Sequence, residues 1–209
     1  YGNWQLGHVD AETYGRKYLK FASAMRKVDP TIKLVAVGVN ERDFHDWNGR
    51  MLKIAGEEID YLSAHHYIPG HFPTYNIPPA KEIYLGVVGF PLEFEQILKD
   101  TRGVINKSHP KGKEILIAYD EWNVWEGTEV DGSERTYALR DGLYTAGMLH
   151  AFQRESSSVT IANLAQLVNA SGAITTNQTE VVVTPNYLAF QLYANHFGDI
   201  LILSQVDCD

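Results

Sequence analysis

The order in which strand-like and helix-like segments follow one another is the feature that most restricts the fold of this chain. Strands are expected at 32–39, 59–67, 114–119 and 159–164, and helices at 10–29, 46–58, 91–106, 133–154 and 184–196. Regular alternation of strands and helices is typical of a β/α architecture with a parallel sheet. The first run, IKLVAVGV, is apolar at nearly every position, as in strands that are covered on both faces. A doubly wound sheet and a (β/α)8 barrel both satisfy this pattern.

The residues at the ends of the strands distinguish the two folds. No Gly-x-Gly-x-x-Gly or Walker-type phosphate loop follows a predicted strand, which argues against a nucleotide-binding doubly wound sheet. Three of the four strands instead run into polar and aromatic groups, HHY, DEWN and the Asn and Gln of NLAQ. Polar residues at the carboxyl ends of the strands are typical of a barrel enzyme. We therefore predict an α/β fold that forms half of a (β/α)8 barrel and is a segment of a longer enzyme.

Composition and charge exclude several classes of partner. The formal net charge is −8, and no basic patch stands out, so neither nucleic acid nor an anionic membrane is an expected partner. No apolar run approaches the ~20 residues needed to span a bilayer. Cys208 is the single cysteine, which rules out a disulfide within the chain. The prolines between positions 69 and 79 predict a long loop after the second strand.

The segment AYDEWNVW at 118–125 turns abruptly from strand formers to acids and aromatics. Side chains alternate along a strand, so Tyr119 and Glu121 are expected on one face and Asp120 on the other. If the first face points into the barrel, Glu121 lies at its mouth as a base or nucleophile, and Asp120 faces outward. The two tryptophans of the segment are expected to wall this carboxylate, as indoles do at sugar sites. A solvated turn is the alternative interpretation of the two acids.

The second strand ends in SAHHY, which places Ser63, His65 and Tyr67 on one face and His66 on the other. On a barrel the first three line the same mouth as Glu121. A structural core position is the alternative for either histidine. No metal site is expected, because His-Glu-x-x-His and comparable spacings are absent. Gly-x-Ser-x-Gly is also absent, which argues against a serine hydrolase.

Four blocks of the chain form a recognisable series, namely YGNWQLGH at 1–8, SAHHY at 63–67, DEWNVW at 120–125 and IANLAQLVN at 161–169. In order and approximate spacing the series resembles the α-L-arabinofuranosidases of glycoside hydrolase family 51. That family is similar to other retaining glycosidases of clan A, with a (β/α)8 barrel followed by a β-sandwich. The resemblance implies a partial catalytic barrel over 1–198, which is the C-terminal half of the (β/α)8 barrel. It also implies the start of a mostly absent β-sandwich domain over 199–209, with 200–203 as its first strand.

The resemblance also implies roles for single residues. Glu121 matches the catalytic nucleophile, which forms a covalent arabinofuranosyl intermediate. Substrate-binding roles carry over to Trp4, Gln5, His65, Tyr67, Asn123, Trp125 and Gln166. Tyr67 resembles the tyrosine that hydrogen-bonds the nucleophile. The family's general acid/base is the Glu of a Gly-Asn-Glu triplet, which by its spacing is expected just upstream of Tyr1.

The activity implied by the resemblance is release of terminal α-L-arabinofuranosyl groups from arabinan, arabinoxylan or their oligosaccharides, by double displacement with retention. It implies no metal or organic cofactor, a homo-oligomer in the intact enzyme, and a cytoplasmic location in preference to a secreted one. The alternatives are another clan A glycosidase, such as an endoglucanase or β-xylosidase, or a non-catalytic sugar-binding segment. Because the acid/base is not in this sequence, we expect the isolated segment to be inactive.

Overall fold

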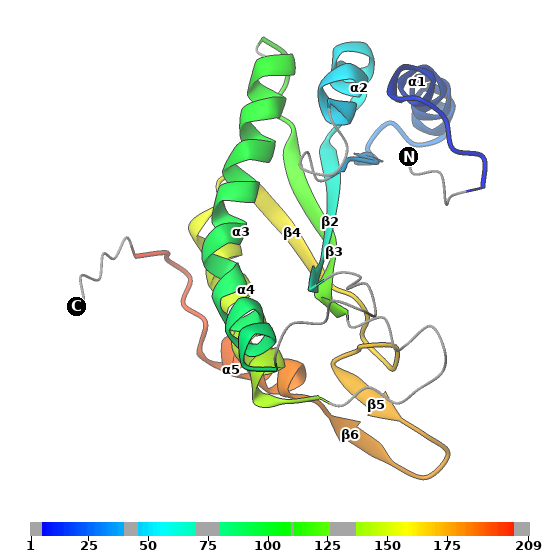
Figure 1. Cartoon of the computed structure of the whole chain (residues 1–209). Coiled ribbons are helices and arrows are strands. Elements are labelled where there is room, and N and C mark those ends of the chain that lie inside the picture. The colour runs from blue at the N-terminus through cyan, green and yellow to red at the C-terminus, as the bar shows by residue number, and fades with distance from the viewer. Residues whose placement is uncertain (1–5, 40–45, 70–79, 110, 126–136, 203–209) are drawn as a thin grey trace.

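A parallel sheet of four strands forms the centre of the molecule (Figure 1). The computed structural model describes residues 6–39, 46–69, 80–109, 111–125 and 137–202. The strands are β1 Val35–Ala36, β2 Tyr61–Pro69, β3 Leu116–Trp125 and β4 Val159–Leu164, in that spatial order and all parallel. Parallel strands whose spatial order follows the chain are the arrangement of a β/α barrel. The predicted fold class, half of a (β/α)8 barrel, is confirmed.

Helices cover one face of this sheet within the described ranges (Figure 1). They are α1 Ala11–Val28, α2 Trp47–Ala55, the 3₁₀-helix η1 Gly56–Glu58, α3 Ala80–Ser108, α4 Leu139–Arg154 and α5 Pro185–His196. Each α-helix packs against the next one in the series, which makes a continuous outer layer. The predicted proline-rich loop lies mostly outside the described residues, as does Ser133, the expected start of the fourth helix.

The start of α1 follows directly from its sequence. The carboxylate of Asp10 accepts a hydrogen bond from the backbone N–H of Thr13 at 2.7 Å, as an N-cap does. Ala22 is buried on the side of the helix that faces the core. Phe21 and Met25, apolar residues of the same helix, are exposed. The apolar stripe of this helix is therefore wider than the surface that the described residues cover.

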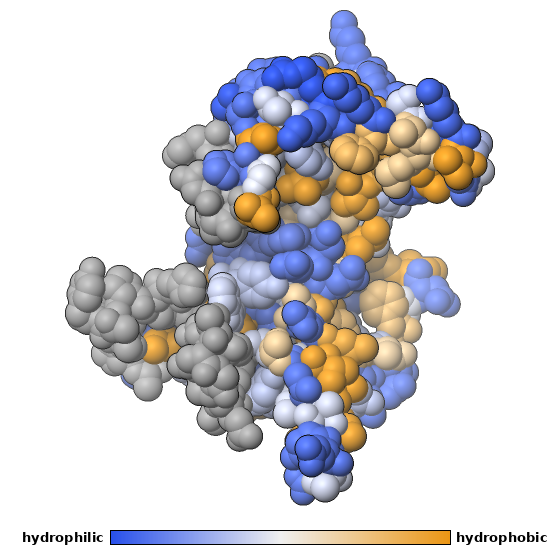
Figure 2. Space-filling view, turned by 90° about the vertical axis from the view of Figure 1, so that its right-hand side faces the viewer, coloured by the Kyte–Doolittle hydropathy of each residue, from blue (hydrophilic) through white to orange (hydrophobic). Residues whose placement is uncertain are grey.

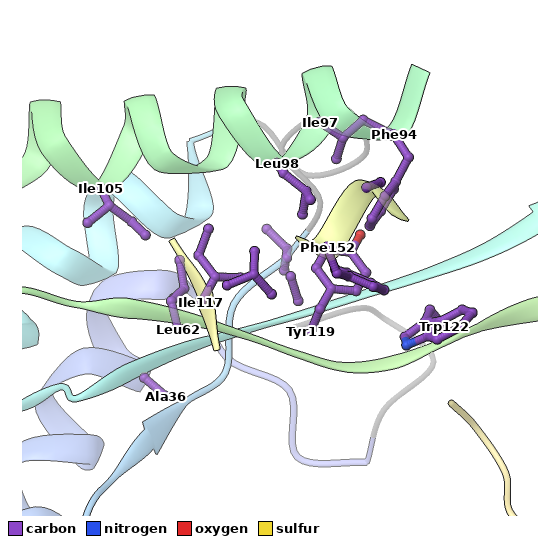
Figure 3. Close-up of a cluster of buried hydrophobic side chains, with 14 of the residues drawn as sticks. Ala36, Leu62, Phe94, Ile97, Leu98, Ile105, Ile117, Tyr119, Trp122 and Phe152 are labelled. Atoms are coloured by element: carbon purple, nitrogen blue, oxygen red, sulfur yellow. The ribbon is translucent and has the colours of Figure 1, made fainter. Parts of the chain in front are cut away.

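The core lies between the sheet and the helices α3 and α4 (Figure 3). Ile117 and Tyr119 of β3 point toward the helices and are buried. The ring of Phe94 from α3 meets Tyr119 edge-on, with 4.8 Å between ring centroids, and also meets Phe152 of α4 at 5.2 Å. Edge-to-face packing suits the quadrupoles of aromatic rings. These contacts fix the face of β3 that points away from the interior of the barrel.

The helix α3 begins earlier than the sequence pattern predicts. Pro91 was expected near its first turn, where a missing N–H costs nothing, but the helix begins at Ala80 and Pro91 lies inside it. Gly147 of α4 lies against the proline ring, so closely that a Cβ there would be 2.7 Å from Cγ of Pro91. The ring is thus used as a packing surface between α3 and α4.

The face of the sheet opposite the helices is open in the described residues. Only Val35 and Ala36 of the expected first strand form a ladder with β2. Ala36 is buried under the helices, whereas Val35 and Val37 on the other face are 46% and 37% exposed. The first strand was expected to be covered on both sides. In a closed barrel this second face is the interior, which four strands alone do not enclose.

The region after β4 contains a hairpin that the sequence pattern does not predict. It consists of β5, Ile174–Thr176, and β6, Val181–Val183, paired antiparallel and projecting from the molecule (Figure 1). Asn177 closes the turn by accepting hydrogen bonds from the N–H groups of Thr179 and Glu180. The strand expected at 200–203 is not formed at 200–202, and these three residues are exposed. A strand needs a ladder partner, and the described residues offer none there.

No helix among the described residues is both long and apolar enough to cross a membrane.

Candidate active site

A β-bulge in β3 sets the direction of the two acids of the DEWNVW segment. Between Ser63 and His65 of β2, the paired positions of β3 advance by three residues, from Ala118 to Glu121. The pairing with β4 shows the same extra residue in β3. A bulge of this kind interrupts the alternation of side chains and is common next to active sites. The expectation that Tyr119 shares a face with Glu121 while Asp120 faces outward is therefore wrong. Tyr119 is buried on the helix side, whereas Asp120 and Glu121 both face the open side of the sheet.

The same bulge moves Trp122 to the opposite face. Trp122 was expected to wall the carboxylate of Glu121, but it is fully buried on the helix side of the sheet (Figure 3). Its ring packs against Tyr144 and Phe152 of α4 and stacks on Phe190 of α5. Strict alternation from Tyr119, which faces the helices, would have placed Trp122 on the open face. The extra residue in β3 places Trp122 in the core instead.

His65 lies between the two carboxylates. Its Nε2 is 3.2 Å from Oδ1 of Asp120, and its Nδ1 is 3.4 Å from Oε2 of Glu121. The hydroxyl of Ser63 donates a hydrogen bond of 2.7 Å to the same Oδ1 of Asp120. The prediction that Ser63, His65 and Tyr67 share one face with Glu121 agrees with these contacts. His66, one residue along, points to the core and stacks on Phe90, with 4.9 Å between ring centroids.

These contacts change the charge states of His65 and Asp120. Burial alone would lower the pKa of His65, but the hydrogen bond with Asp120 and the charges of Glu121 and Asp120 raise it above its usual value. Burial alone would raise the pKa of Asp120, but its hydrogen bonds with His65 and Ser63 lower it below its usual value. The pair therefore favours an imidazolium next to an ionised carboxylate.

Glu121 is held on one of its two carboxylate oxygens. The hydroxyl of Tyr67 donates a hydrogen bond of 3.0 Å to Oε2, the oxygen that also faces Nδ1 of His65. In the described part of the chain, both recorded contacts of this carboxylate involve Oε2. The Tyr67 ring in turn meets Trp125 edge-on, with 5.8 Å between ring centroids. A carboxylate fixed through one oxygen can present the other to an electrophile.

The open side of the sheet forms a pocket of about 780 Å³ around these residues. Asp120, Glu121, His65 and Ser63 line one wall. Apolar residues, including Val35 and Val37 of the β1 segment, line another part, together with residues 6–9, Tyr14 and Trp47. Figure 2 shows apolar and polar side chains side by side on the face of the molecule that it displays. A pocket with mixed walls and a few convergent polar groups is typical of a small-molecule site.

Asn123 and Gln166, two further predicted site residues, are not among the residues that line this pocket. Asn123 is fully buried, and its amide donates hydrogen bonds to the carbonyl oxygens of Ala165 at 2.6 Å and Ser171 at 2.7 Å. It thereby ties β3 to the segment that follows β4. Gln166, in that segment, is exposed. The structure thus places Asn123 as an anchor of the segment that carries Gln166.

The remaining predicted site residues are Trp4 and Gln5, which lie outside the described residues. Among the residues that the structure does describe, no group of three or more His, Cys, Asp or Glu side chains could hold a metal ion. The residue that sequence reasoning missed is Asp120, which it placed on the wrong face. The adjacent acids of the DEWNVW segment were visible, but the extra residue in the ladder was not.

Comparison with known proteins agrees with this geometry. Residues 120–209 match the family profile of the α-L-arabinofuranosidase C-terminal domain. A crystal structure of an arabinofuranosidase superposes with a TM-score of 0.80 and 36% identity, covering 95% of this chain and 39% of that one. The GH51 α-L-arabinofuranosidase of Thermotoga petrophila superposes with a TM-score of 0.67 and 35% identity over the same shares. The chain belongs to the family 51 α-L-arabinofuranosidases.

Comparison with a curated relative shows how much of a family 51 protein this chain spans. The intracellular exo-α-(1→5)-L-arabinofuranosidase of Streptomyces lividans is 31% identical over 191 residues, which are 84% of this chain and 28% of the relative. The family 51 chain thus spans well under half the length of the proteins that it matches. The match to the C-terminal domain begins at Asp120, inside β3, and the predicted domain boundary between 198 and 199 stays a prediction.

Proposed function

We propose that the protein containing this chain is a retaining glycoside hydrolase that releases terminal α-L-arabinofuranosyl groups, with Glu121 as its nucleophile. The observation that carries the proposal is the Glu121 carboxylate, which faces the pocket and is held through Oε2 by Tyr67 and His65. The relatives support the substrate class, since those compared above are arabinofuranosidases. Arabinan, arabinoxylan and their oligosaccharides are the substrates that carry such groups.

The reaction follows from one attacking and one protonating carboxyl group. Oε1 of Glu121 attacks the anomeric carbon, the bond to the leaving oxygen breaks, and a general acid protonates that oxygen. Water then attacks the same carbon and gives its proton to the group that acted as general acid, and the electron pair of the ester bond returns to Glu121. Retaining enzymes place the two carboxyl groups roughly 5 to 5.5 Å apart. Asp120 does not suit the role of acid, because its contacts lower its pKa and keep it ionised.

The general acid is therefore a residue outside those described here, in agreement with the family resemblance. The same proposal assigns sugar-binding roles to Trp4, Gln5, Trp125 and Gln166, with His65 and Tyr67 holding the nucleophile. Asn123 contributes by fixing the segment that carries Gln166. These roles need neither a metal nor an organic cofactor, because two carboxyl groups supply the chemistry.

We also propose that the enzyme acts inside the cell on α-(1→5)-linked chain ends and forms a homo-oligomer. Support for the location and the linkage comes from the names of the Streptomyces lividans and Bacillus subtilis relatives, both called intracellular exo-α-(1→5)-L-arabinofuranosidases. The oligomer is carried over from the family resemblance.

The nucleophile is tested by substitution in the intact protein. Glu121→Gln is expected to lower kcat on 4-nitrophenyl α-L-arabinofuranoside by at least about 10⁴-fold, because the amide cannot form the ester. Glu121→Ala should regain activity with azide, which replaces the carboxylate and gives an arabinofuranosyl azide of inverted configuration. Glu82→Gln, an exposed change of the same kind in the first turn of α3, is the control and should act like the parent.

The alternatives give different results in the same assays. Hydrolysis of an aryl β-D-xyloside or β-D-glucoside in preference to the arabinofuranoside would indicate another clan A glycosidase. Binding of arabinose without hydrolysis of any aryl glycoside by the intact, folded protein would indicate a sugar-binding protein. Undiminished hydrolysis by Glu121→Gln would remove Glu121 from its proposed role.

A further inference from the structure

Each ring nitrogen of His65 faces a carboxylate oxygen, although contact with the nucleophile Glu121 requires only one of them. Its Nδ1 faces Oε2 of Glu121, while Nε2 faces Oδ1 of Asp120, which is itself fixed by the hydroxyl of Ser63. The Ser63 hydroxyl also lies 3.3 Å from Nε2. All four residues come from β2 and β3, and the bulge in β3 is what brings Asp120 to the ring.

The two ring nitrogens restrict the states that His65 can adopt. A neutral imidazole carries one N–H, so a ring that donates to Asp120 would turn the lone pair of Nδ1 toward the Glu121 carboxylate. The imidazolium donates to both carboxylates and avoids this repulsion. Asp120 is therefore the group that keeps the ring both oriented and charged when the charge of Glu121 changes.

We propose that Asp120, held by Ser63, is a positioning residue that keeps the His65 imidazolium directed at Glu121 during the second half of the reaction. This inference rests on the proposed role of Glu121 as nucleophile. In the free enzyme two carboxylates surround the ring. In the covalent intermediate Glu121 is an ester without charge, so Asp120 is the one carboxylate still in contact with the ring.

The consequence concerns the bond that breaks in the second step. Water attacks the anomeric carbon, loses its proton to the general base, and the electron pair of the ester bond returns to the Glu121 oxygens. An imidazolium at Nδ1 stabilises the negative charge as it develops on Oε2, together with the Tyr67 hydroxyl. Without Asp120 the ring would meet the departing carboxylate in its neutral form, and hydrolysis of the intermediate would slow.

Few other charged groups compete for this ring in the described part of the chain. The titratable groups that line the same pocket are Asp120 and Glu121 from β3, Tyr14 from α1 and His8 from the segment before α1. Of these, Asp120 and Glu121 are the two that the structure records within ion-pair distance of the ring. The neighbouring Tyr67 hydroxyl is directed to Glu121.

The test is a double-mutant cycle in the intact enzyme, with Asp120→Asn, His65→Gln and the double variant. The readouts are kcat, KM and the initial burst of dinitrophenol from an activated aryl α-L-arabinofuranoside. Asp120→Asn keeps the shape of the side chain and removes its charge. We expect kcat to fall about tenfold or more. KM should fall with it and a burst should grow, because the intermediate accumulates, so kcat/KM changes much less.

If Asp120 acts through His65, adding Asp120→Asn to His65→Gln should change kcat by less than about twofold. A purely structural role would give additive losses and a raised KM, and either result would overturn the proposal. Asp100→Asn, the same change on the exposed side of α3, where Asp100 accepts a hydrogen bond from Gln96, is the control. If Asp120→Asn does not fold, Ser63→Ala enters the same cycle with the same criterion of non-additivity.

The outcome is separable from that of the proposed function. Failure of the proposed function is seen in the parent and in the Glu121 variants, as absence of arabinofuranoside hydrolysis or activity that survives loss of the carboxylate. Failure of the positioning role of Asp120 is seen as an additive cycle in an enzyme whose Glu121 variants behave as expected.

Discussion

At the scale of single residues, His65 and Asp120 contribute to stability over different ranges of pH. The pKa of His65 is raised in the folded state, so its contribution is complete below the unfolded value of about 6.5 and is lost as pH rises through the higher folded value. The pKa of Asp120 is lowered, so its contribution is present above about 3.9 and is lost as pH falls through the lower folded value. Both contributions are present together between about pH 4 and 6.5.

This difference gives a measurable pH dependence. We expect His65→Gln to lower the melting temperature of the intact protein more at about pH 5.5 than at about pH 8.5, since the imidazolium contributes only at the lower pH. Differential scanning calorimetry of parent and variant at the two pH values measures it. His196→Gln, an exposed change in the last turn of α5, is the control. An equal loss at both pH values would mean that the charge of His65 does not contribute to folding.

The sequence predicted part of this residue-scale arrangement. The side of Ser63, His65 and Tyr67 follows from the two-residue period of a strand, and β2 is regular enough for that rule to hold. The positions of Asp120 and Trp122 do not follow from the two-residue period. The bulge adds one residue to β3 without leaving a signal in the hydrophobic pattern of the sequence. The bulge depends on the pairing of β3 with both neighbours, which is a property of the sheet and not of the local sequence.

At the scale of elements, the packing of α3 against α4 depends on a glycine facing a proline. Gly147→Ala is expected to destabilise the protein by about 1 to 3 kcal/mol, because the new Cβ would overlap the rigid ring of Pro91 and the helices would have to separate. Gly103→Ala in α3 is the matched change, since no atom lies within 4 Å of the point that its new Cβ would occupy. It should stabilise by about 0.5 to 1 kcal/mol through helix propensity.

Urea unfolding of the two variants measures both effects. A stabilising Gly147→Ala would show that α3 and α4 can separate without cost, and a destabilising Gly103→Ala would show a contact that the structure does not record.

Element boundaries were predictable where a local signal exists. The start of α1 at Asp10 and of α5 at Thr184-Pro185 follow from capping chemistry and from proline at the first turn. The start of α3 could not be predicted in this way. Pro91 resembles a proline at the first turn of a helix, but it lies in the middle of α3 and serves as a packing surface. The β5–β6 hairpin was missed because its strands are three residues each, shorter than any periodicity can reveal.

At the scale of the whole molecule, large apolar side chains are exposed in at least two regions of the described residues. Val35 and Val37 are exposed on the open face of the sheet, and Leu192 and Phe197 of the α5 region are exposed at 63% and 65%. Contiguous exposed apolar patches usually mark a surface that another part of a protein covers. The class of fold was predictable from the order of elements, whereas this exposure was not, because it depends on what closes the barrel.

A comparison of two proteins tests this view. The 209-residue chain alone is expected to bind the dye anilinonaphthalene sulfonate more strongly than a longer protein that also contains the regions matching the rest of the relatives. It should not hydrolyse 4-nitrophenyl α-L-arabinofuranoside, because the proposed general acid, which protonates the leaving oxygen, is expected outside this chain. Fluorescence titration and a colorimetric assay measure the two properties. Hydrolysis by the short chain would contradict the need for an acid outside it.

The extra residue in β3 also determines how this strand responds to a change of length. Asp120 and Glu121 occupy the space of one regular position, so removal of either restores strict alternation between Tyr119 and Trp122. The helix-facing side chains on both sides of the bulge would keep their orientation, and one inward carboxylate would remain. Insertion or deletion of a single residue therefore determines whether the barrel mouth carries one acid or two. The side chains that pack in the core keep their positions in both cases. Insertion and deletion at this point could change the chemistry of the mouth without a redesign of the fold.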